Sequence, residues 1–132
     1  MYLIALLTAA FTFAAPADPP VEWLGETTVD VGDIPRGQDH TYVYYFRNLT
    51  GAPLVIDNVR AGCGCTATDW AEAPVEPGEE GQIRVTYDAR DAGYFRKGIK
   101  VFFAGHRGGH KLWLEGYVEP RAAAVEGDRG ER

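Results

Sequence analysis

Short runs of β-branched and aromatic residues, each ended by glycine, proline or an acidic turn residue, recur along the central part of the chain. In the run at 81–88, GQIRVTYD, apolar and polar side chains alternate, so that Ile83, Val85 and Tyr87 share one face. Successive side chains of a β-strand point to opposite faces, whereas those of a helix repeat about every 3.6 residues. The pattern therefore predicts strands with one buried and one solvated face, and hardly any helix.

The whole central region follows this pattern, and it predicts an all-β chain folded as an immunoglobulin-like β-sandwich of about seven strands. An open barrel with similar strand spacing is the alternative fold. Strands are expected at 26–32, 40–48, 53–59, 81–88, 95–105 and 110–118, with a further short strand over 67–70. The side chains expected in the core are Ile83, Val85, Ile99, Val101, Leu112 and Leu114, and those expected at the surface are Gln82, Arg84 and Glu115.

The two ends of the chain differ from this central region in composition. Residues 1–17, MYLIALLTAAFTFAAPA, carry no charged side chain and end in small residues. Such a segment is typical of a secretory signal peptide, here with cleavage expected before Asp18, and it is too short to span a bilayer comfortably. The sequence therefore predicts a secreted or periplasmic protein with no transmembrane segment after signal removal. Its sandwich domain is expected over 21–119, followed by a disordered tail over 120–132.

Charge and motif content narrow the classes of function. The net charge is -6 over 132 residues, so electrostatics give no support to a nucleic-acid partner. The sequence contains no serine, no Gly-x-Ser-x-Gly, no glycine-rich phosphate loop and no His-Glu-x-x-His. We therefore expect a protein that is not an enzyme and has no resident cofactor.

Both cysteines of the chain lie one glycine apart, as Cys63-Gly64-Cys65 after the third expected strand. In a flat strand two such residues have their Cα atoms roughly 6.5–7 Å apart, at the outer limit for a disulfide. A bridge would require Gly64 to bend, for which a positive φ is expected. Three interpretations stay open: two small residues that fill a bend, a reversible disulfide or redox-responsive pair, and a metal site in which Cys63 and Cys65 bind copper(I).

Histidines are the other residues that favour a metal interpretation. His106 and His110 flank two glycines in HRGGH, which is also typical of a solvated hairpin loop. In a sandwich whose strands run up and down, this hairpin is expected at the end opposite the cysteines. His40 and the loop at 88–93 are expected at the same end as the cysteines.

Several other residues have a functional and a structural interpretation. Asn48 begins an Asn-Leu-Thr sequon but lies in a predicted turn, where asparagine is common. Asp88, Arg90 and Asp91 are typical of a solvated charged loop, and less often of an acid–base or cation site. The tryptophans are Trp23, Trp70 and Trp113. Of these, Trp113 is expected on the outer face with Tyr117, where Tyr45 or Phe102 would complete an apolar binding patch.

Three segments together resemble a bacterial family known as domain of unknown function 1573. They are YFRNLTGAPLVIDNVRAGCGCTATDW, PVEPGEEGQIRVTYDARDAGYFRKGIKV and LWLEGYV, with CGCT at Cys63 to Thr66 as the signature. The resemblance runs from about Val21 to Glu119 and implies a secreted or periplasmic immunoglobulin-like domain. It also implies a distant similarity to sandwich modules of the sperm-protein and cilia-associated type, and it names no reaction.

Two functional hypotheses follow from these observations. The first is an exported immunoglobulin-like module that binds an unidentified protein or cell-envelope component through sandwich edges and end loops. The second is a redox-responsive or copper(I)-handling protein that uses Cys63 and Cys65. The state of the two thiols distinguishes between them.

Overall fold

The computed structural model describes residue 10, residues 12–13 and residues 18–122. The predicted signal peptide at 1–17 lies almost wholly outside the described residues, and so does the predicted tail from residue 123 onward. Within the described ranges, no helix has the length and apolar character needed to cross a membrane.

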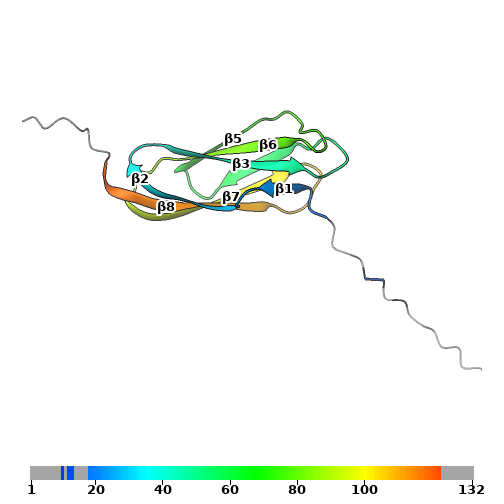
Figure 1. Cartoon of the computed structure of the whole chain (residues 1–132), viewed down its shortest axis with the longest axis horizontal. Coiled ribbons are helices and arrows are strands. Elements are labelled where there is room, and N and C mark those ends of the chain that lie inside the picture. Colours follow the sequence, from blue (N-terminus) through cyan, green and yellow to red (C-terminus); the bar gives the residue numbers. More distant parts are fainter. Residues whose placement is uncertain (1–9, 11, 14–17, 123–132) are drawn as a thin grey trace, which may run out of the picture.

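Within residues 18–122 the chain forms eight strands, arranged as two packed layers (Figure 1). They are β1 (Val21–Leu24), β2 (Thr28–Arg36), β3 (His40–Asn48), β4 (Ile56–Ala61), β5 (Thr66–Trp70), β6 (Glu80–Tyr87), β7 (Gly93–Phe103) and β8 (His110–Ala122). One sheet has the order β1-β3-β6-β5, and the other has the order β2-β8-β7-β4. The predicted all-β sandwich is confirmed.

Three features of the strands differ from the expectation. The four-residue strand β1 adds an eighth strand, which the sequence analysis missed, and it pairs with β3. The strand β2 pairs with β8 in a parallel manner, so β1 and β2 belong to different sheets although they follow each other in the chain. The strand β8 continues to Ala122, so the first residues of the segment expected as a tail extend a sheet.

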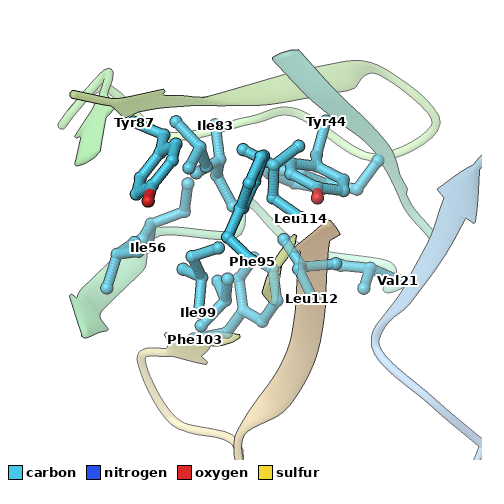
Figure 2. Packing of buried hydrophobic residues seen from close by; sticks show 14 of the residues in the cluster. Val21, Tyr44, Ile56, Ile83, Tyr87, Phe95, Ile99, Phe103, Leu112 and Leu114 are labelled. Carbon is cyan, nitrogen blue, oxygen red and sulfur yellow. The ribbon is translucent and has the colours of Figure 1, made fainter. Parts of the chain in front are cut away.

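The core lies between the two sheets and consists of inward side chains from both of them (Figure 2). All six side chains expected in the core are at most 1% exposed, and Gln82 and Arg84 are exposed as predicted. Glu115 differs from the prediction: it is half-buried, because it forms an ion pair of 3.3 Å with Arg96 on the neighbouring strand. The register of β6, β7 and β8 is therefore the one that the alternation predicts.

A hydrogen bond of a buried tyrosine crosses this core. The hydroxyl of Tyr44 on β3 donates a hydrogen bond of 2.7 Å to the backbone carbonyl of Trp113 on β8, in the opposite sheet. Burial, and then the neighbouring Tyr42, raises the pKa of Tyr44 well above the usual range of a tyrosine. Tyr44 therefore remains protonated and keeps its donor, so that a buried hydroxyl is satisfied without interrupting the apolar layer.

Val101 offers a direct test of the core. Its side chain on β7 is fully buried, so we expect Val101→Ala to lower the free energy of unfolding by about 1–3 kcal/mol, through lost burial and the cavity left behind. Denaturant unfolding measures this change. Arg84→Ala, at an exposed position of β6, is the control and should change stability by less than about 0.5 kcal/mol. Equal losses in the two variants would contradict the register.

Candidate functional site

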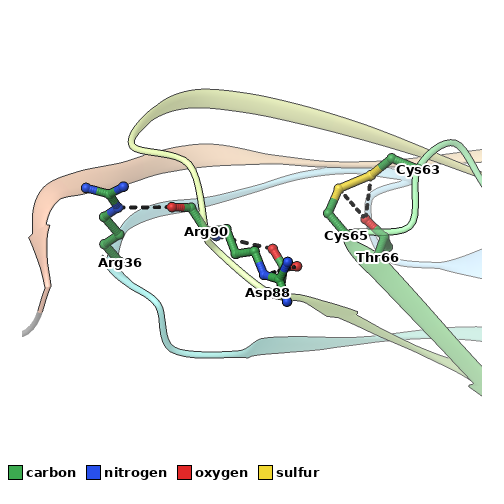
Figure 3. Close-up of polar contacts among 6 residues, drawn as sticks. All are labelled: Arg36, Cys63, Cys65, Thr66, Asp88 and Arg90. Atoms are coloured by element: carbon green, nitrogen blue, oxygen red, sulfur yellow. Dashed lines mark hydrogen bonds and ion pairs between the residues drawn. A yellow bond between two sulfur atoms is a disulfide. The ribbon is translucent and has the colours of Figure 1, made fainter.

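The two cysteines form a disulfide within a tight turn between β4 and β5 (Figure 3). Their Cα atoms lie 5.3 Å apart, closer than in a flat strand. The amide of Thr66 donates to the carbonyl of Cys63 at 3.4 Å, which closes a β-turn over 63–66. The expected positive φ at Gly64 is wrong, because Gly64 is not among the positive-φ residues. The turn therefore brings the two sulfurs together without the left-handed conformation.

Polar contacts fix this turn to the neighbouring strands. The buried hydroxyl of Thr66 lies 3.6 Å from the sulfur of Cys63 and 3.8 Å from that of Cys65. The amide of Asp88 donates to the carbonyl of Cys65 at 3.0 Å, which joins the turn to the 88–93 loop. Cys65 also packs against the core, so the disulfide is partly covered and not a fully exposed loop tip.

The two ends of the sandwich separate the cysteines from two of the histidines. In sheet register, His40 and Thr66 both lie opposite Tyr87, so His40 and the cysteine turn share one end, as predicted. The His106–His110 hairpin follows Phe103, which pairs with the first residue of β4, whereas the cysteine turn follows the last residue of β4. Among the described residues, no group of three or more His, Cys, Asp or Glu side chains is placed to hold a metal ion.

At the hairpin end, His110 connects the two sheets. The indole Nε1 of Trp23 on β1 donates a hydrogen bond of 3.3 Å to Nδ1 of His110 on β8. The same two rings lie close to Phe103, with the His110 and Phe103 ring centroids 5.3 Å apart. Burial, and then the neighbouring His106, lowers the pKa of His110, so the neutral imidazole that accepts from Trp23 is favoured.

Next to the cysteine turn, the outer face of the β2-β8-β7-β4 sheet is hollowed into a groove of about 340 Å³. Its lining residues are Arg60, Ala61, Gly62, Gly98, Ile99, Lys100, Lys111 and Trp113. A Cβ at Gly98 would lie 2.8 Å from the ring of Trp113, so glycine is needed there for the indole to lie across β7. The amide of Gly62 donates to the carbonyl of Gly98 at 3.1 Å, which holds the cysteine turn against the groove.

The apolar patch expected around Trp113 forms only in part. Trp113, Tyr117 and Phe102 lie on one sheet, but Tyr45 belongs to β3 of the other sheet and is wrongly assigned to this patch. Strand periodicity gives the face of a side chain within its own sheet and does not say which sheet the strand joins. The guanidinium of Arg96 lies 4.2 Å from the ring centroid of Trp113, so this face is cationic as well as aromatic.

The remaining sequence candidates have structural roles. Asn48, the last residue of β3, is 1% exposed, and its side-chain amide donates to the carbonyls of Ala52 and Val75. The sequon asparagine therefore holds the turn that follows β3. In the charged loop, Arg90 forms an ion pair of 3.4 Å with Asp88, and its carbonyl accepts from Arg36 (Figure 3).

Solved structures with the same architecture define the class of domain. The ASH/PapD-like domain 7 of human CEP192 superposes with a TM-score of 0.66 at 10% identity, over 87% of this chain and 98% of that one. A protein of unknown function from Porphyromonas gingivalis W83 gives 0.61 at 14% identity, over 74% of this chain and 46% of that one. The YadV chaperone gives 0.52 at 11% identity, over 86% and 55%. The chain therefore has an immunoglobulin-like sandwich fold, which is similar to that of the PapD-like domain of CEP192. The chain spans about half of the length of the last two proteins.

Sequence comparison then gives the family. The profile described as protein of unknown function (DUF1573) matches residues 23–118, which is most of the chain. The chain belongs to this family, as the Cys63 to Thr66 signature and its surroundings predicted. Among curated proteins none matches it.

The contact between Trp23 and His110 leads to a pH dependence. Because folding lowers the pKa of His110 below its ordinary value near 6.5, we expect stability to fall as the pH falls through that value. The loss should level off once the folded state is itself protonated. His110→Asn, which keeps a side-chain acceptor but does not titrate, should flatten the stability profile between about pH 7 and about pH 5. Thermal unfolding at several pH values measures this. His40→Asn, at the opposite end, is the control, and an unchanged profile in His110→Asn would contradict the assignment.

Proposed function

We propose that the chain is an exported, non-enzymatic immunoglobulin-like module that binds another protein or a cell-envelope component. The groove beside Trp113 carries this proposal, because an apolar, concave patch on the solvated face of a sheet marks an interaction site. The groove also joins an edge strand to an end loop, since Arg60 lies on β4 and Gly62 belongs to the cysteine turn. Edges and end loops are the surfaces through which sandwich domains most readily bind partners.

Two observations support the other parts of the proposal. The uncharged apolar start at 1–17 favours export, with a mature chain that begins near Asp18. The contacts of the cysteines favour binding over catalysis. The sulfurs are joined in a disulfide, and the side-chain hydroxyl near both of them is that of Thr66, whereas a cysteine nucleophile requires a free thiol and a base within hydrogen-bond reach.

Site-specific photo-crosslinking tests the binding face. With the photoreactive residue p-benzoylphenylalanine at Phe102, beside the groove, we expect a discrete crosslinked product in the periplasmic fraction of a Gram-negative host. The same residue at Tyr45, exposed on the outer face of the other sheet, is the matched control and should give no such product. Mass spectrometry of the products also reads the mature N-terminus. Crosslinking from Tyr45 alone, or an intact Met1 on cytoplasmic protein, would contradict the proposal.

The disulfide favours a second candidate function, a redox-responsive or copper(I)-handling pair. The bridge closes a very small ring, so it restrains the unfolded chain little, and stability alone is a poor reason for it. In the reduced form the same turn would present two thiolates, with the Thr66 hydroxyl able to donate to either. Two thiolates are ligands that suit copper(I).

Alkylation followed by mass spectrometry tests this second candidate. If the pair is functional, the exported protein should take up no alkylating reagent until it is reduced, and the reduced protein should bind copper(I). Cys63→Ser should abolish both properties and leave thermal stability nearly unchanged, because the ring is so small. A wild-type protein that never oxidises and binds no copper(I), together with an unfolded Cys63→Ser variant, would assign the cysteines a packing role.

A further inference from the structure

Three cations lie in one line across three neighbouring strands on the outer face of the β2-β8-β7-β4 sheet. Arg60 on β4 is directly opposite Lys100 on β7, and Lys100 is directly opposite Lys111 on β8. Directly opposite residues of an antiparallel pair share a face, with their Cβ atoms about 4.5–5.5 Å apart. All three side chains are exposed. We call this line the cation row.

Within the described residues, the cation row brings like charges together without a carboxylate partner. Like charges directly opposite each other in a sheet are destabilising, and this row contains two such pairs. Across residues 18–122, none of the three cations takes part in an ion pair. Arg60 and Lys100 instead both lie over the ring of Phe102, at 5.3 Å and 5.5 Å from its centroid. The chain has a net charge of -6, so carboxylates are plentiful elsewhere but do not neutralise this row.

The apolar depression of the groove adjoins the cation row. Gly62, Gly98 and Trp113 form the next outward-facing line, in which Gly98 pairs with Trp113 and accepts a hydrogen bond from Gly62. The Trp113 ring covers Gly98, because a Cβ added there would lie 2.8 Å from the ring. A Cβ added at Gly62 would meet only the carbonyl oxygen of Gly98, at 3.5 Å, so the open part of the groove lies beside Gly62. None of the eight residues that line the groove is acidic. The site therefore combines an apolar recess with three neighbouring positive charges.

We propose that this groove binds an acidic segment of a partner protein. An apolar side chain of the segment would occupy the recess beside Gly62 against the Trp113 indole, and neighbouring carboxylates would pair with Arg60, Lys100 and Lys111. This inference rests on the proposed binding function and adds the chemistry of the partner. Such a segment would contact both parts of the site. The recess would bind an apolar group, and the cation row would bind negative charges spaced along an extended chain.

Two other classes of ligand, sulfated sugars and anionic membranes, match these features less well. A sugar ring would stack on a free aromatic face, but Arg96 already lies over the Trp113 ring. An anionic membrane presents a broad surface, whereas the apolar part of this site is a recess between strands. Binding of a sulfated sugar polymer and of anionic vesicles is therefore measured in the same experiment as two alternative outcomes.

Binding of a random copolymer of glutamate and tyrosine, measured by calorimetry or biolayer interferometry, tests the proposal. The copolymer carries carboxylates next to apolar rings, and polyglutamate carries carboxylates alone. We expect the wild-type domain to bind the copolymer more tightly than polyglutamate at about 0.05 M salt, and to release it at about 0.5 M salt. Lys100→Glu should weaken binding by about tenfold or more, and Lys111→Glu should also weaken it. Arg84→Glu, an equal charge reversal on the outer face of the other sheet, is the control and should bind normally.

Stability gives a second readout that a merely structural role would not produce. Glu at position 100 would lie between Arg60 and Lys111 and turn two repulsive pairs into two attractive pairs. We therefore expect Lys100→Glu to raise the melting temperature by about 2–5 °C while it removes binding. A gain in stability together with a loss of binding is the sign of a charge arrangement kept for a ligand.

Several outcomes would overturn the inference. Unchanged copolymer binding by Lys100→Glu would remove the cation row from the site, and equal binding of polyglutamate would remove the apolar recess. Tighter binding of phosphatidylglycerol vesicles or dextran sulfate would replace the protein segment by a lipid or a sulfated polymer. A salt-sensitive dimer that Lys100→Glu abolishes would make a second copy of the chain the occupant. If the copolymer does not bind but Phe102 still crosslinks, the acidic segment is wrong and the binding module stands.

Discussion

The register of β4, β7 and β8 is the constraint on which both the core and the outer face depend. Ile99, Val101 and Leu112 are at most 1% exposed because alternate residues of these strands point between the sheets. The residues between them must then point outward, and Lys100 is placed opposite both Arg60 and Lys111. A shift of one residue would separate the cations, but it would also bring charged side chains into the core. Hydrophobic burial thus fixes a like-charge arrangement that electrostatics alone would avoid.

Aromatic rings make this arrangement tolerable without neutralising it. Phe102 lies beneath Arg60 and Lys100, and Trp113 lies beneath Arg96, which in turn pairs with Glu115. That ion pair lies two outward-facing lines away from the cation row, so it leaves the row without a carboxylate partner in the described part of the chain. Exposed cation–π contacts are worth about 0.5–1 kcal/mol, which is similar to the cost of a like-charge pair. The surface is near balance without a partner, so an added anion would bring a net gain.

The sequence alone predicts the strands that form the core, but it does not predict how these strands pair into two sheets. Alternation in GQIRVTYD and its neighbours predicted which residues are buried, because burial imposes a period of two. The strand β1 was missed, since a run of four residues after two prolines carries too little periodicity. The parallel pairing of β2 with β8 depends on contacts between distant segments, and no local pattern encodes it. The same limit explains why Tyr45 was placed near Trp113 and why the cation row was not predicted: both depend on which strands are neighbours.

The role of the cysteine turn depends on its position in the fold as well as on its local sequence. Cys-Gly-Cys indicated a bend, but the sequence could not say that Gly62 would extend the β4–β7 pairing by donating to Gly98. Through this bond, the residue before the disulfide also lines the groove. The Cα separation of 5.3 Å in the bridged turn is shorter than in an extended chain, so the bridge favours the turn over a continued strand. Reduction would remove that preference directly beside Gly62. The binding groove and the redox-responsive pair therefore share the cysteine turn. A change in the redox state of Cys63 and Cys65 would alter the side of the groove that Gly62 forms before any other part of it.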